Sequence, residues 1–169
     1  MKCLTVFYSR AGENHFAGER KNLSVGNTER AAKVIAEAAG SDLFKLEQKT
    51  PYAEDYDTCV KQVVEDFKSK ARPELLAKPE SLEGCDEIYL GFPNYCGDMP
   101  MAVYTFLESY DWDGKTIHPF CTHEGSGMGR IESRIAETCP GAKIASGLAV
   151  KGSEVDDKTD EIISWVKGN

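Results

Sequence analysis

Residues 88–100 read IYLGFPNYCGDMP. The stretch opens on a short apolar run rich in β-formers, passes through a loop of Pro, Asn, Gly and Asp, and then begins a helical pattern. A buried strand followed by a turn and an amphipathic helix is the repeating unit of a parallel sheet with helices on its faces. If this unit decides the fold, it should recur on both sides of the stretch.

The unit does recur along the chain. Apolar strand candidates lie at Leu4–Tyr8, Leu43–Leu46, Ile88–Phe92, Ile117–Thr122 and Ile144–Val150. Helical patterns follow them at Thr28–Ala39, Val60–Ala71, Met99–Tyr110, Gly129–Thr138 and Asp157–Lys167. Asp98 is expected to cap the third helix. These units predict an α/β three-layer sandwich, in which a five-stranded parallel sheet of order 2-1-3-4-5 has helices on both faces.

Pro119 conflicts with this pattern, because it falls inside the fourth strand. The predicted order makes that strand central, and proline has no N–H to offer a neighbouring strand. We therefore expect either a strand that begins at Phe120 or a bulge at Pro119.

The bulk composition excludes several classes of function. The 169 residues suit one domain, expected to span residues 1–169. The formal net charge of −8 argues against nucleic-acid binding, which needs Lys and Arg to replace counterions. No apolar stretch is long enough to span a membrane, and no export signal is evident, so a cytoplasmic location is expected. The six scattered cysteines form no CxxC pair, so free thiols are expected and a metal site is not.

Ligands of open α/β sheets bind beyond the carboxyl ends of the strands, where the first loop contains a candidate anion site. The loop begins at Ser9 and Arg10 and ends at Asn27 and Thr28, where a helix starts. Free N–H groups at a helix N-terminus favour a phosphate, and the alternative interpretation is that Asn27 and Thr28 are only an N-cap. Thirteen residues, Glu13–Val25, interrupt this loop.

Two further loops contain candidate contacts for a flat ligand. After the third strand, Tyr95 could stack on an aromatic ring, and Gly97 can adopt either sign of φ. After the fourth strand, the segment THEGSGMG at residues 122–129 would let the backbone approach a ligand edge. It is neither a dinucleotide-binding GxGxxG nor a GxSxG nucleophile elbow. Each loop alone is also compatible with a plain connector.

The three loops together resemble those of the flavodoxin-like family. The segments SRAGEN (9–14) and GNTE (26–29) look like a flavodoxin phosphate loop that carries an insertion, as in a subgroup of small bacterial flavodoxins. The segment GFPNY (91–95) resembles the loop that packs against the isoalloxazine ring, and THEGSG (122–127) the loop on its far side. The resemblance covers nearly the whole chain and implies FMN as the cofactor.

Position by position, the resemblance implies three sets of cofactor contacts. The phosphate would be held by Ser9, Arg10, Asn27 and Thr28. One side of the ring would be lined by Pro93, Asn94, Tyr95, Cys96 and Gly97. The other side would be lined by Thr122, Glu124, Gly125, Ser126 and Gly127. The subgroup usually carries Trp at the position of Cys96, so this chain lacks an indole contact and FMN is expected to bind more weakly. No residue is assigned a catalytic role.

The resemblance implies an FMN-binding electron-transfer protein that shuttles electrons between redox partner proteins. An NAD(P)H-dependent FMN oxidoreductase of the quinone-reductase type is the alternative, so whether the protein is an enzyme stays open. A flavin-free interaction domain is a third possibility. If flavin is bound, acidic groups such as Asp98 and Glu124 would disfavour its anionic reduced form, and the Gly97 peptide could turn its carbonyl toward the ring.

Overall fold

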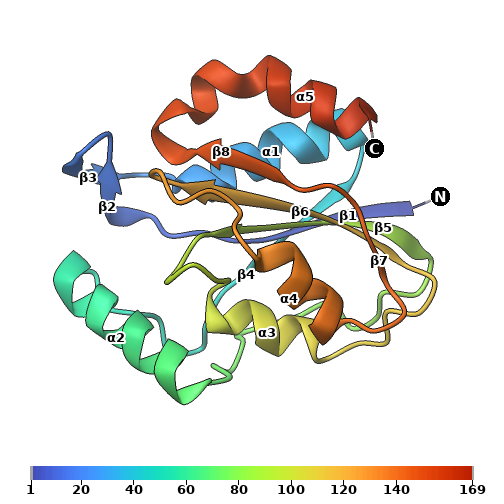
Figure 1. The fold of residues 1–169 in the computed structure, drawn as a ribbon, viewed down its shortest axis with the longest axis horizontal. Helices are drawn as coiled ribbons and strands as arrows, with labels where there is room; N and C mark the ends of the chain where they lie inside the picture. The colour runs from blue at the N-terminus through green and yellow to red at the C-terminus, as the bar shows by residue number, and fades with distance from the viewer. Residues whose placement is uncertain (1, 169) are drawn as a thin grey trace.

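The computed structural model describes residues 2–168, except for the side chain of Lys2, and its centre is a parallel sheet (Figure 1). The sheet order is β4-β1-β5-β6-β7, and β8 also pairs with β6. The strands are β1 (Lys2–Tyr8), β4 (Asp42–Leu46), β5 (Cys85–Pro93), β6 (Thr116–His123), β7 (Lys143–Ile144) and β8 (Leu148–Lys151). The predicted order 2-1-3-4-5 and the flavodoxin-like sandwich are confirmed.

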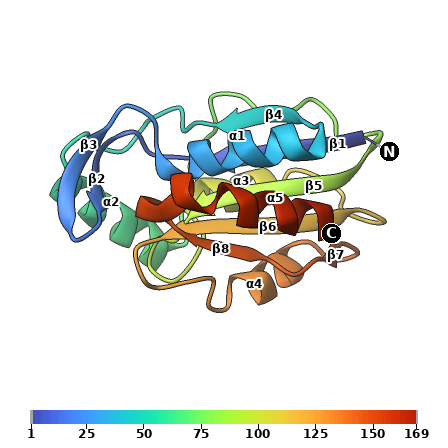
Figure 2. The ribbon, with the colours of Figure 1, turned by 90° about the horizontal axis from the view of Figure 1, so that it is seen from above.

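Helices cover both faces of the sheet (Figures 1 and 2). One face carries α1 (Asn27–Ala39) and α5 (Thr159–Gly168), which follows the short 3-10 helix η1 (Gly152–Lys158). The other carries α2 (Tyr56–Ser69), α3 (Met101–Leu107) and α4 (Ile131–Thr138). Two buried apolar clusters fill the layers, one centred on Leu90 and Phe106, the other on Phe7 and Ile35. Within residues 2–168, no helix is long and apolar enough to cross a bilayer.

Pro119 lies within β6, so the strand does not begin at Phe120, and the expected bulge is found on the neighbouring chain segment, where residues 145–147 stand opposite residues 118–119. Leu90 pairs with Pro119 in regular register on the β5 side. On the other side the pairing is interrupted, because β7 pairs only up to Ile117 and β8 begins at Phe120. The carbonyl of Ile117 accepts a hydrogen bond from the β7 side. Residues two apart in a strand direct their backbone groups to the same neighbour, so the nitrogen of Pro119 also faces that side. The missing N–H therefore coincides with the break that divides the predicted strand Ile144–Val150 into β7 and β8.

The insertion at Glu13–Val25 folds mainly as a β-hairpin, which the sequence did not predict. Its strands are β2 (Gly12–Phe16) and β3 (Glu19–Leu23), paired antiparallel and separate from the main sheet. The hairpin stands at the carboxyl end of the sheet, above α2 (Figure 1). It therefore borders the region in which the ligand was expected.

The third helix begins later than predicted, at Met101 with Pro100 as its N-cap. Asp98 is therefore not the cap. Its side chain is buried and accepts hydrogen bonds from Met99 N and the Tyr104 hydroxyl, each at 2.7 Å. Proline has no N–H, so Pro100 at the N-cap adds no further unpaired donor to the start of the helix.

Candidate functional site

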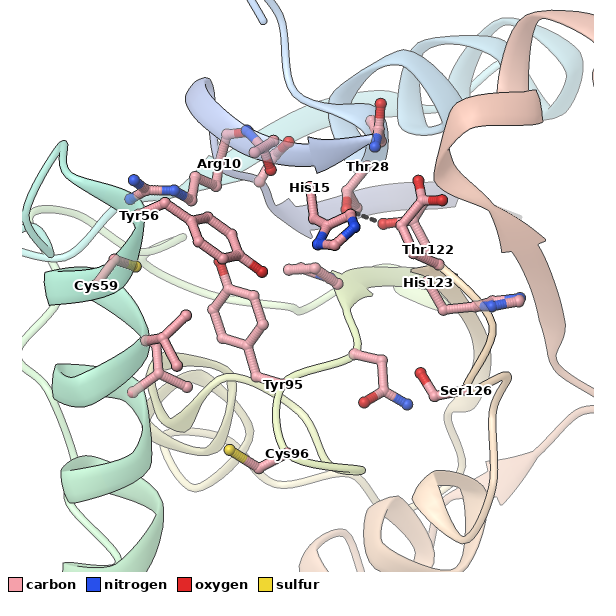
Figure 3. A pocket seen from close by; sticks show the side chains of 18 of the residues that line it. Arg10, His15, Thr28, Tyr56, Cys59, Tyr95, Cys96, Thr122, His123 and Ser126 are labelled. Carbon is pink, nitrogen blue, oxygen red and sulfur yellow. Dashed lines mark hydrogen bonds between the residues drawn. The ribbon is translucent and has the colours of Figure 1, made fainter. Parts of the chain in front are cut away.

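A cavity of about 560 Å³ opens at the carboxyl ends of the strands (Figure 3). Its volume lies in the range of about 300–1,000 Å³ that is typical of small-molecule and cofactor sites. The loops after β1, β5 and β6 supply most of its wall, together with α2 and the hairpin. All of the predicted site residues line it except Gly97 and Gly127.

The N-terminus of α1 forms one end of the cavity and suits an anion. Its N-cap is Gly26, and no side chain of the N-cap residue satisfies the helix's free N–H groups. Instead, Glu29 N donates to the Ser9 hydroxyl at 3.1 Å. A Cβ on Gly26 would lie 2.2 Å from that oxygen and 2.5 Å from the Arg10 carbonyl, so only glycine fits. The close approach of β1's loop to the helix leaves backbone N–H groups and the positive end of the dipole at the cavity.

Thr28 and Thr122 connect this end to the third loop. Their hydroxyls are 2.7 Å apart, and both residues are buried (Figure 3). Each hydroxyl keeps acceptor or donor capacity beyond this bond. The two predicted residues, which are 94 positions apart in sequence, thus form one polar wall.

Arg10 lines the cavity, but its guanidinium extends toward α2 (Figure 3). Nε donates to Glu13 O at 3.0 Å, and Nη1 and Nη2 donate to Ala53 O and Glu54 O at 2.9 and 2.7 Å. These bonds join the hairpin to the segment before α2. A direct hydrogen bond from Arg10 to a phosphate would have to replace one of them, so the structure favours a supporting role for Arg10.

Asn27 is also engaged at the edge of the cavity. Its side-chain oxygen accepts from Arg30 Nη2 at 2.6 Å, and its amide packs against Gly152 at the start of η1. A Cβ on Gly152 would lie 2.3 Å from Asn27 Nδ2. Asn27 therefore fixes the start of α1 against the C-terminal part of the chain.

The second loop is a two-residue turn held by Asn94. Tyr95 N donates to Asp98 O at 2.9 Å, and Asp98 N donates to Tyr95 O at 3.0 Å. Cys96 and Gly97 have φ values of 58° and 72°, the signature of a type I′ turn. Asn94 Oδ1 accepts from Gly97 N at 2.9 Å, and Asn94 Nδ2 donates to the carbonyl of Gly127 at 2.9 Å.

Gly97 and Gly127 therefore shape the loops without lining the cavity. Asn94 N also donates to Thr122 O at 2.9 Å, so Asn94 joins the second and third loops by both backbone and side chain. The spacing between these two loops is consequently fixed before any ligand enters.

Tyr95 and Cys96 form the less polar side of the cavity. The Tyr95 ring packs edge-to-face on Tyr8, with centroids 6.1 Å apart. Burial raises the pKa of Tyr95 well above its ordinary value, so the phenol stays neutral. Cys96 is exposed, and partial burial of its thiol together with Asp98 raises its pKa. It is a thiol rather than a reactive thiolate at neutral pH.

The third loop is held by its own polar side chains. The Glu124 carboxylate accepts from Ser153 N at 3.0 Å and from the Ser153 hydroxyl at 3.2 Å. His123 Nδ1 accepts from Gly125 N at 2.9 Å. Burial lowers the pKa of His123, so the neutral imidazole that this bond requires is the stable form at pH 7.

The two acids singled out in the sequence are thus placed differently. Asp98 is buried outside the cavity lining, with Arg134 Nε 3.4 Å from its carboxylate, whereas Glu124 lines the cavity with both oxygens engaged. Glu124 is the only one of the pair that is positioned to act on a ligand there.

Sequence reasoning missed the part of the wall supplied by α2 and the hairpin. This part of the wall consists of Asn14, His15, Tyr56, Cys59, Val60, Val63 and Val64. The valines were recognised in the sequence as an apolar helical pattern, and such a pattern normally marks a face buried in the core. The composition of α2 gave no signal that this face borders a cavity instead.

The sequence matches the model of one protein family, described as Flavodoxin, over residues 22–169. This chain belongs to the flavodoxin family. The matched region contains the second and third loops and the start of α1, while Ser9 and Arg10 precede it. No curated protein matches this flavodoxin significantly.

Solved structures from several bacteria resemble this flavodoxin. A Bacteroides uniformis protein, provisionally described as a flavoprotein, is 28% identical, with a TM-score of 0.75 and coverage of 98% of this chain and 97% of that one. A Lactobacillus acidophilus flavoprotein crystallised in complex with FMN is 21% identical, with a TM-score of 0.65 and coverage of 92% and 97%. Oxidised flavodoxin 1 from Bacillus cereus is 16% identical, with a TM-score of 0.58 and coverage of 99% and 95%. The last two comparisons support the fold.

Proposed function

We propose that this flavodoxin binds one FMN in the cavity and transfers electrons between redox partners. Family membership supports the cofactor, as does the complex of the Lactobacillus acidophilus flavoprotein with FMN. The observation that carries the proposal is the meeting of an α1 N-terminus with the loops after β5 and β6 in one cavity. FMN supplies the redox chemistry, and the protein binds and orients it.

The residues present fit such a group. Because Gly26 has no side chain, the Ser9 hydroxyl can lie close to the N-terminus of α1. A hydroxyl group beside a helix N-terminus suits the phosphate of FMN. Thr28 and Thr122 offer hydroxyls next to that end. The loops at residues 93–96 and 122–126 line the cavity farther on, and Asn94 fixes their separation. In this assignment the ring lies between the two loops.

An absorption spectrum tests the cofactor. Freshly purified protein, or protein mixed with FMN and then freed of excess, should retain flavin absorbance. Stepwise dithionite reduction should then show a one-electron-reduced stage, as expected for a carrier that passes single electrons. Failure to retain flavin, with no change in flavin fluorescence during titration, would leave only a flavin-free interaction domain.

A second candidate function is a reductase that passes FMN's electrons to a small molecule and takes them from NAD(P)H. It is favoured by the additional wall that α2 and the hairpin give the cavity, since a carrier needs only an exposed flavin edge. Direct reduction of the FMN-loaded protein by NADH or NADPH, followed at the flavin absorbance, separates the two candidates. A carrier should show no such reduction on the time scale of turnover.

A further inference from the structure

The first half of the apolar face of α2 borders the cavity, whereas Phe67, farther along the helix, packs against the core. Cys59 is the only buried residue of α2. Val60 is 40% exposed, and Val63 and Val64 are half-buried. All three valines line the cavity. An amphipathic helix usually buries such a stripe, and apolar side chains left facing a concave space commonly mark a ligand site.

Polar contacts outside the core hold α2 at this distance from the sheet. The Tyr52 hydroxyl donates to Asp66 at 2.5 Å, and Tyr56 N donates to Glu13 Oε1 at 3.2 Å. Arg20 of the hairpin forms an ion pair with Asp57 at 2.5 Å, and its guanidinium also lies over the Tyr56 ring. Because the contacts of Glu13 and Arg20 tie the start of α2 to the hairpin, and that of Tyr52 ties its later part to the preceding segment, the space beneath the valines is part of the fold.

Two hydrogen-bonding side chains stand at the rim of the same space. The rings of His15 and Tyr56 meet edge-to-face with centroids 6.3 Å apart, and both line the cavity. Within the described part of the chain, neither the His15 ring nitrogens nor the Tyr56 hydroxyl has a hydrogen-bond partner. Both can donate to a carbonyl oxygen.

The charge of this wall argues against a phosphate-bearing ligand. The described residues that α2 and the hairpin contribute to the lining include no Lys or Arg, and Asp55 caps the start of α2, in contrast to the open start of α1, where the phosphate of FMN is assigned. A wall of valines with donors at one end instead suits a flat, uncharged ring that carries carbonyl oxygens.

We propose that α2 and the hairpin form a second subsite, beside the cofactor, that binds flat aromatic or quinonoid compounds bearing carbonyl groups. The valines would contact the face of the ring, and His15 and Tyr56 would donate to its oxygen. This inference rests on the proposed binding of FMN by the three loops and assigns the remaining wall to a small-molecule ligand.

The test is calorimetric titration of the FMN-loaded protein with duroquinone, an uncharged probe whose fully substituted ring does not add to the Cys96 thiol. We expect saturable binding to the oxidised wild-type protein. The double variant Val63→Thr/Val64→Thr keeps the shape of the wall and adds hydroxyl groups. It should weaken duroquinone binding by about tenfold, the usual scale for a small change in an apolar pocket. Its affinity for FMN should stay within about twofold of wild type.

The matched control is Val34→Thr on α1, a half-buried valine that packs on the opposite face of the sheet. It should leave both ligands unaffected, and circular dichroism should show all three proteins folded. Absence of duroquinone binding to FMN-loaded wild type would overturn the subsite. An equal loss of FMN affinity in the double variant would also overturn it, because α2 would then belong to the cofactor site. A protein that retains no FMN would instead reject the proposed function, which the flavin absorbance reveals separately.

Discussion

Helices α1 and α2 have similar lengths and similar apolar periodicity, yet they use their apolar faces differently. Helix α1 buries Ala31, Ala32 and Ile35 against the sheet, with exposed fractions of 1% or less. Helix α2 buries only Cys59 and turns its valines to the cavity. The comparison teaches that the same periodic pattern can serve core packing in one helix and ligand contact in another.

The N-termini of the two helices differ in the same sense. The Asp55 carboxylate caps α2 by accepting from Thr58 N at 2.8 Å. Helix α1 has glycine at its N-cap and receives only the Ser9 hydroxyl from another loop. Helix α2 is therefore closed to an anion at its start, whereas α1 is open to one.

The largest expected effect contrasts the two apolar faces. Ile35→Ala should lower the free energy of unfolding by about 2–5 kcal/mol, because it leaves a cavity in a fully buried layer. Val64→Ala should lower it by less than about 1 kcal/mol, because the cavity beside Val64 already exists. Urea unfolding followed by circular dichroism measures both. Equal losses would mean that α2 packs on the core in solution.

The second prediction contrasts the two N-termini. Ser9→Ala should weaken FMN binding by about tenfold, the scale of one hydrogen bond near a charged group, and alter stability little. Asp55→Ala should do the reverse, reducing thermal stability through loss of the cap while leaving FMN affinity unchanged. Flavin fluorescence titration and thermal unfolding give the two readouts. An unchanged FMN affinity in Ser9→Ala would place the phosphate elsewhere.

The third prediction concerns pH and the third loop. Burial lowers the pKa of His123 below its ordinary value of 6.5, so the fold favours the neutral ring. The contribution of neutral His123 to the stability of the folded state is therefore present above pH 6.5 and is lost as pH falls through the lowered pKa. Protonation of Nδ1 would remove the bond from Gly125 N and weaken FMN binding a few-fold.

FMN affinity measured between pH 5 and 8 checks this expectation. His123→Gln should flatten the dependence, and His15→Gln, on the hairpin, serves as the control for the remaining titrations. A profile that His123→Gln does not change would assign the pH dependence to another group.

The smallest expected effect concerns the contact between the hairpin and α2. Arg20 and Asp57 are both substantially exposed, so their ion pair is weakened by solvent and salt. Arg20→Gln should cause a slight decrease in thermal stability at low salt, and the difference should vanish at high salt. A large, salt-independent loss would indicate that the stacking of Arg20 on Tyr56 dominates instead.

Much of the fold could be predicted because strand and helix periodicity are local. The alternation of apolar runs with helical patterns indicated a parallel sheet with helices on both faces, and the right-handedness of crossovers left few strand orders, of which 2-1-3-4-5 is one. Pro119 could not be interpreted locally, because its effect depends on which neighbour its missing N–H would face. The inserted hairpin was missed because its β3 strand, ERKNL, shows little of the alternation that reveals a half-buried strand.

Most residues of the predicted cofactor site line one cavity, because parallel strands end at the same edge and bring their loops together. The sequence could not tell which side chains are already occupied. Arg10 lines the cavity, but donates to carbonyls, and Asp98 turns into the core to accept from Tyr104. Ala53 is 43 residues from Arg10, and even Tyr104, six residues from Asp98, reaches it only because the helix begins after Pro100, so these pairings depend on the folded chain.

The sequence by itself determined the α/β class and the three loops that resemble those of a flavodoxin, since each depends on patterns within a few neighbouring residues. It narrowed the strand order to a few topologies, because parallel crossovers are right-handed. Only the tertiary structure decided that α2 faces a cavity, that the insertion forms a hairpin attached to α2, and that Asn94 joins the two loops. These outcomes depend on contacts between segments far apart in the chain, where the free energy of packing and hydrogen bonding selects among faces that local periodicity leaves equivalent.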